Sequence, residues 1–120
     1  MISSTKEEVY MNTIEKTLLY CRFSMRYQGY RELRECIKIA VEKEERLMYV
    51  GGIYQEVAEK YHISASGVER NIRTVLNRAW ENGSKEPLEE LAGGKLYERP
   101  SVSEVIEMLA CYLKEQEKKK

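Results

Sequence analysis

Residues 55–80, QEVAEKYHISASGVERNIRTVLNRAW, decide the fold of this chain. Val57 and Tyr61 lie four residues apart with the small Ala58 beside Val57, which gives a first helix one apolar side. Residues 62–64 are long enough only for a turn. Helical spacing resumes after the turn with Val68, Ile72, Val75, Leu76 and Ala79. The stretch therefore predicts a helix-turn-helix, in which a small residue in the first helix lets the second cross closely over it.

The turn contains a single apolar residue, Ile63, which we expect to be its apolar plug. Ser64 or Ser66 can cap the second helix, and Glu69 follows Ser66 at the spacing of a capping box. We therefore expect the second helix to span residues 66–81.

A polar side of the second helix lies opposite its apolar stripe. Its residues are Arg70, Arg73, Thr74 and Asn77, with Gly67 and Asn71 near the start. Arginine offers a planar donor fork that binds guanine O6 and N7 together or grips a phosphate. A helix that presents such residues from its first turns can enter a major groove and read base edges. The alternative interpretation is a solvated helix face with ordinary charges.

The composition fits one small domain, residues 1–120, with a net charge of +0. A neutral chain is not a general nucleic-acid binder with a basic surface, so DNA binding must come from local segregation of charge. Residues 22–31 contain three arginines and no acid, whereas residues 81–90 contain four glutamates and one lysine.

No metal site or cofactor is expected. Cys21, Cys36 and Cys111 form no Cys-x-x-Cys pair, and the single histidine, His62, has no partner at ligand spacing. Buried or half-buried free thiols in a reducing cytosol are the simpler interpretation. No apolar run approaches the ~20 residues that span a bilayer, so we expect a cytoplasmic protein without a membrane partner.

The remaining chain predicts an all-α fold of about six helices, a winged-helix-like arrangement without a clear wing. A first helix should span residues 5–22, and Gly29 should break the chain before a second helix that begins at Tyr30 and ends at Gly51-Gly52. Further helices are expected at residues 53–61, 66–81 and 85–91. Ser101 or Ser103 should open the last helix, and residues 114–120 should form a charged, fraying tail.

These residues resemble the DNA-binding effector domain family of stage zero sporulation protein A, a response regulator of sporulation initiation. The motifs in the helix-turn-helix are Ala65-Ser66, Val68-Glu69-Arg70, Ile72-Arg73 and Ala79-Trp80. Further motifs are Gly29-Tyr30 with Leu33-Arg34, Ile53-Tyr54 with Val57-Ala58, and Pro100 with Ser103-Glu104 and Ile106. The resemblance covers roughly residues 14–114.

The resemblance implies a six-helix domain that binds a short DNA box and recruits or blocks RNA polymerase. It implies base or phosphate contacts for Glu69, Arg70 and Arg73. We expect Ser64 and Ser66 to donate hydrogen bonds to a DNA phosphate, because they lie at the N-terminus of the same helix. Residues 85–91 correspond to a region near the polymerase sigma factor. The expected partner is double-stranded DNA, with the sigma factor and a second copy of the chain on DNA as further candidates.

The chain departs from the family at two positions of the expected interface. The family usually has arginine at Gly67, and losing a bidentate contact there costs about 1–3 kcal/mol of base discrimination. It usually has lysine near Gly51, and losing that phosphate contact lowers the salt slope by about one charge. The family also has a phosphorylatable receiver domain, and we expect this stand-alone domain to lack it.

Two functions follow from this interpretation. The first is a sequence-specific DNA-binding transcription regulator of the sporulation-initiation type, which reads the major groove with residues 66–81. The alternative is a protein-interaction module that has lost strong DNA binding and pairs with a full-length regulator or with RNA polymerase. An enzyme is not expected, because the sequence has no nucleophile with a base and no phosphate-cradling glycine loop.

Overall fold

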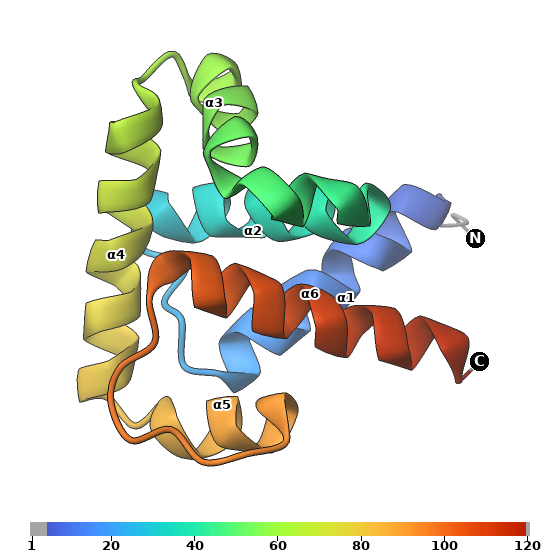
Figure 1. Cartoon of the computed structure of the whole chain (residues 1–120), viewed down its shortest axis with the longest axis vertical. Helices are drawn as coiled ribbons and strands as arrows, with labels where there is room; N and C mark the ends of the chain where they lie inside the picture. The colour runs from blue at the N-terminus through green and yellow to red at the C-terminus, as the bar shows by residue number, and fades with distance from the viewer. Residues whose placement is uncertain (1–4, 120) are drawn as a thin grey trace.

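The computed structural model describes residues 5–119, and within them the chain is helical, without a strand (Figure 1). The elements are α1 (Lys6–Tyr20), α2 (Gln28–Glu42), the 3-10 helix η1 (Glu44–Tyr49), α3 (Val50–Tyr61), α4 (Ala65–Glu81), α5 (Lys85–Ala92) and α6 (Val102–Lys118). The all-α prediction with six α-helices is therefore confirmed. Residues 1–4 and 120, the ends of the expected domain and tail, lie outside the described residues.

Helix α2 is the centre of the core. It packs against α1, α3, α4 and α6. Its apolar side recurs at helical spacing, and Leu33, Ile37 and Ala40 are fully buried. Figure 1 shows α4 along one edge of the molecule, with α2 and α6 running from that edge toward the termini. One side of α4 therefore faces the core and the other faces solvent.

Gly29 lies inside the first turn of α2, so the predicted break before this helix is wrong. The glycine is buried, and a Cβ built on it would lie 2.1 Å from the backbone oxygen of Asn71 in α4. No side chain fits at that distance. Gly29 therefore permits a close approach of two helix backbones, which places the start of α2 directly against the middle of α4.

Gly51 and Gly52 do not end the second helix as predicted; they belong to the first turn of α3. The chain leaves α2 at Lys43, where φ is −132° and ψ is 74°. A Cβ on Gly51 would lie 2.9 Å from the Tyr49 ring, and the Gly52 carbonyl accepts a hydrogen bond of 3.1 Å from the Arg46 guanidinium. The two glycines thus leave room for η1 to fold back over the start of α3.

Helix α6 begins beside α4 and packs against α2, α4 and α5 (Figure 1). Ser101 and Glu104 form a reciprocal capping box at its start, and α6 continues to Lys118 through most of the predicted tail. Cys21 and Cys36 are buried as predicted, and burial raises the pKa of Cys21 to about 12, whereas Cys111 is exposed, contrary to the prediction. None of the described helices combines the length and hydropathy that crossing a bilayer requires.

Candidate nucleic-acid interface

Hydrogen bonds shape the turn between α3 and α4. His62 adopts the left-handed conformation at φ 58° and ψ 43°. Its N–H donates to the Glu59 carbonyl, and the Ile63 N–H donates to the Ala58 carbonyl at 3.0 Å, the two bonds of a Schellman motif. Ile63 is 39% exposed, so the predicted apolar plug is wrong. The backbone bonds, rather than burial of Ile63, define how α4 leaves α3.

Ser64, not Ser66, caps α4. Its Oγ accepts a hydrogen bond of 3.0 Å from the Gly67 N–H, while Ser66 Oγ lies 3.2 Å from Ser64 Oγ. The capping box predicted from Ser66 and Glu69 is therefore not formed, and α4 begins one residue earlier than expected. A Cβ on Gly67 would lie 3.1 Å from Ser64 Oγ, so a larger residue there would press on the cap. Both serines are exposed at the helix N-terminus, where anions are favoured.

The core side of α4 is formed by the predicted apolar stripe, and all five of its residues are buried. They are Val68, Ile72, Val75, Leu76 and Ala79. Asn71 lies at the border of this stripe and is half-buried. Its amide Nδ2 donates to both carboxylate oxygens of Glu32 in α2, at 3.1 and 3.3 Å. Asn71 is thus directed toward the body of the protein, away from the other polar residues of the helix.

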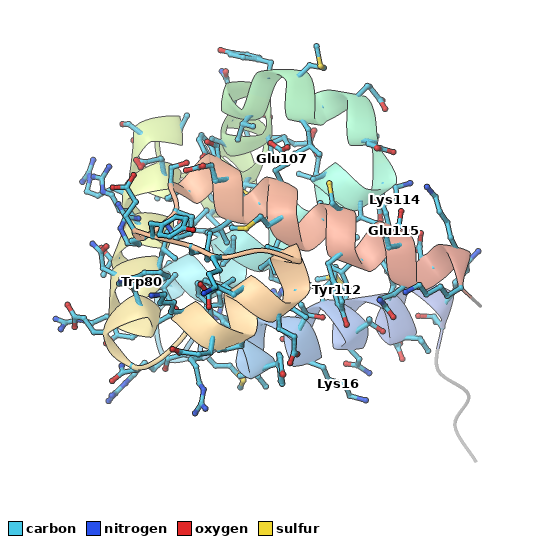
Figure 2. All side chains as sticks on the ribbon, turned by 60° about the horizontal axis from the view of Figure 1, so that its bottom comes forward. Lys16, Trp80, Glu107, Tyr112, Lys114 and Glu115 are labelled. Carbon is cyan, nitrogen blue, oxygen red and sulfur yellow. The ribbon has the colours of Figure 1, made fainter. Side chains whose placement is uncertain are left out.

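The solvent side of α4 is polar and predominantly basic. Its exposed residues are Ser66, Arg70, Arg73, Thr74, Asn77, Arg78 and Glu81. Within residues 5–119, Arg70 takes part in no ion pair, so its guanidinium is available to a ligand. Figure 2 shows nitrogen-tipped side chains projecting outward along α4, the helix that carries the labelled Trp80. The structure therefore brings the predicted arginines together on one outward face.

Arg73 has an intrahelical partner. Its guanidinium donates to both carboxylate oxygens of Glu69 at 2.8 Å, one helical turn earlier. The Arg73 side chain remains 46% exposed. An exposed pair of this kind contributes only about 0.3–0.5 kcal/mol. A phosphate or a base edge can therefore replace Glu69 as the partner of Arg73 at little cost.

The basic segment 22–31 leads into the face of α2 that touches α4. Arg22, Arg26 and Arg31 are exposed, and Arg22 has a left-handed φ of 72°. Lys60 at the end of α3 instead forms an ion pair of 2.7 Å with Glu35. Basic residues thus lie both on α4 and in residues 22–31, which lead into α2, the helix that packs against α4.

A hollow of about 950 Å³ lies away from α4, between α1, α2 and α6, where Tyr10, Val41 and Leu113 line it. No cluster of three or more metal-ligating side chains occurs among the described residues. A protruding helix with a basic outer side fits a groove of its own width, and the B-DNA major groove admits an α-helix.

Two residues that position this site were missed in the sequence. The sequence predicts a chain break at Gly29 and no role for Glu32. A signal for Glu32 did exist, because it lies on the apolar side of α2, four residues before Cys36 and next to Leu33. A carboxylate in an apolar stripe requires a partner, and that partner is Asn71.

The fold and the site define the class of the protein: it is a helix-turn-helix domain whose second helix presents basic residues to solvent. A family model described as "Sporulation initiation factor Spo0A C terminal" matches residues 10–113, and the chain belongs to this family. It is therefore a DNA-binding regulator domain of the sporulation-initiation type, in a family of regulators rather than enzymes. The resemblance inferred from the motifs is confirmed over nearly the whole chain.

Proposed function

We propose that this chain is a sequence-specific transcription regulator that inserts α4 into the major groove of duplex DNA. The observation that carries the proposal is the outward face of α4, where Arg70 is exposed and takes part in no ion pair among residues 5–119. Such a guanidinium gives up no ion pair when it binds DNA, and it can donate two hydrogen bonds to guanine.

Of the other polar residues, some are suited to contact base edges and some to contact phosphates. Thr74 and Asn77 follow Arg70 on the exposed side and are suited to base edges or to the sugar-phosphate backbone. Arg73 can leave Glu69 for a phosphate, while Glu69 can accept from cytosine N4. Ser64 and Ser66 lie at the helix N-terminus and their hydroxyls are suited to a phosphate, whereas the Gly67 N–H already donates to Ser64 Oγ. Asn71 is excluded from this set because its amide is bound to Glu32.

The direct test is selection of bound duplexes from a random pool, followed by salt titration of the winner. The wild type should bind with an affinity that falls steeply with salt. Arg70→Ala should weaken binding to the selected duplex by about 1–3 kcal/mol and relax selection at one base pair. Lys16→Ala is the matched control, because Lys16 is an exposed cation on α1 (Figure 2). Equal losses for the two variants, or salt-insensitive binding, would contradict the proposal.

A protein-interaction role is a second candidate, favoured by exposed apolar residues outside α4. Met48 and Tyr49 of η1 are 90% and 73% exposed, and Tyr97 before α6 is 91% exposed. The resemblance also implies a sigma-factor contact at α5, where Glu86 and Glu90 are exposed. Size-exclusion runs with and without sigma factor, with and without duplex, test both this contact and self-association on DNA. A lone monomer in every run would exclude this role.

A further inference from the structure

A buried carboxylate of α2 forms hydrogen bonds with the core side of α4. Glu32 is fully buried and lies one turn into α2, and within residues 5–119 it takes part in no ion pair. Both of its carboxylate oxygens accept hydrogen bonds from the Asn71 side-chain amide of α4. Burial raises the pKa of Glu32, while hydrogen bonds from Asn71 and Gln28 act in the opposite direction. A carboxylate in this environment is costly to keep unless its hydrogen bonds are made.

The same turn of α4 receives a second contact from α2. The Asn71 backbone oxygen is the atom that a Cβ on Gly29 would strike, so the two backbones touch there. The backbone contact sets how closely α4 can approach α2. The hydrogen bonds to Glu32 approach from the side chain of the same residue, and they limit rotation of α4 about its own axis. Arg70 is the adjacent residue, so rotation at Asn71 would redirect its guanidinium.

We infer that Glu32 and Asn71 are positioning residues for base recognition: the hydrogen bonds between them set the rotation of α4, and thereby which base edge Arg70 reaches. This inference rests on the proposed DNA-reading role of α4. Asn71, which the sequence suggested as a DNA contact, acts through Glu32 instead. The general attraction to phosphates depends on exposed cations, so it does not require this contact.

The experiment uses Glu32→Leu, Asn71→Ala, the double variant, and the conservative variant Glu32→Gln. Leucine fills a similar volume without an acceptor, whereas glutamine keeps an oxygen for the Asn71 amide. Glu35→Leu is the matched control, because Glu35 is a second buried carboxylate of α2 that pairs with Lys60 of α3 rather than with α4. Each variant is measured for its Kd on the selected duplex, its Kd on a scrambled duplex, and its unfolding in urea.

The discrimination ratio between the two duplexes should fall at least about fivefold in Glu32→Leu and in Asn71→Ala, a loss comparable with that of one base contact. The double variant should lose no more than either single variant. Glu32→Gln and Glu35→Leu should keep the ratio, and all folded variants should keep the scrambled-duplex Kd and its salt slope. If Glu32→Leu does not fold, Glu32→Ala takes its place in the comparison, because alanine also lacks an acceptor for the Asn71 amide.

Two results would overturn the inference while leaving the proposed function intact. One is loss of discrimination in Asn71→Ala but not in Glu32→Leu, which would make Asn71 itself a base contact. The other is an unchanged ratio in both single variants. Failure of the proposed function is distinguishable, because it is seen in the wild type alone, as equal affinity for every duplex.

Discussion

The two sides of α4 hold their polar side chains in different ways. On the core side, Asn71 is tied to the fully buried Glu32 of another helix, next to the backbone contact at Gly29. On the solvent side, Arg73 is tied only to Glu69 of its own helix, and Arg70 is exposed without an ion pair among the described residues. Buried polar contacts are costly to break, whereas exposed pairs exchange partners easily. The helix is therefore fixed where it meets the protein and adaptable where it meets a ligand.

Gly29→Ala should give the largest effect, because it attacks the core-side contact directly. The new methyl carbon would lie 2.1 Å from the Asn71 backbone oxygen, so α2 and α4 must move apart. We expect a loss of ~3 kcal/mol in the free energy of unfolding, measured by urea denaturation. Gly94→Ala is the control, because a Cβ there meets nothing within 4 Å. Equal stability of the two variants would show that the close approach is not required.

Glu32→Gln should stabilise the protein at neutral pH, by on the order of 1 kcal/mol, because it removes a buried charge while keeping an acceptor for Asn71. Burial raises the pKa of Glu32 above its ordinary value of 4.5, so the folded protein binds this proton more readily than the unfolded chain does. The resulting stability is present in full below the ordinary value and is lost as the pH rises through the folded pKa.

Urea denaturation of wild type and Glu32→Gln between pH 4 and pH 7 measures this difference. The groups that face Glu32 are Gln28, Asn71 and the Cys36 thiol, whose own pKa is raised chiefly by burial and also by Glu32. The gap in stability should widen toward pH 7 in favour of Glu32→Gln. A gap that is constant over this range would mean that Glu32 does not titrate abnormally.

Local patterns predicted α4, but contacts across the sequence did not follow from them. The five apolar residues of α4 were identified from their spacing alone, and every one is buried. Arg70 was placed on the outer side by the same periodicity. The role of Gly29 depends on Asn71, and the roles of Gly51 and Gly52 depend on Tyr49 and Arg46. From sequence alone, a glycine predicts the end of a helix. Its role in a close contact can be recognised only when its neighbour in space is known.

The candidate site shows the same division. Exposure of Arg70, Thr74 and Asn77 followed from helical periodicity, whereas Asn71 lies only one residue from Arg70 and faces Glu32. Two serines both suited the capping pattern, and the choice of Ser64 depends on the backbone geometry at the end of the turn. Residues at the border of an apolar stripe are those whose direction periodicity does not determine.

His62→Gly should have a smaller effect, at the turn that delivers α4 to its place. Histidine is strained in the left-handed conformation observed here, whereas glycine adopts it freely but also gains entropy in the unfolded chain. We expect a net stabilisation of roughly 0.5–1 kcal/mol in thermal or urea unfolding. His62→Ala keeps the strain and should not stabilise. Stabilisation by alanine equal to that by glycine would rule out strain as the cause.

Glu69→Gln should change stability least, because it acts on the solvent side. Its loss removes one exposed i,i+4 pair, which contributes about 0.3–0.5 kcal/mol. The same change frees Arg73 and removes a negative charge from the reading face, so affinity for a scrambled duplex should rise by up to about threefold at low salt. Glu115→Gln is the control, because Glu115 is an exposed member of an i,i+3 pair with Lys118 on α6. If Glu69→Gln instead destabilises the fold as much as Gly29→Ala does, the contacts on the solvent side are required for folding. The solvent side of α4 would then not be free to bind DNA.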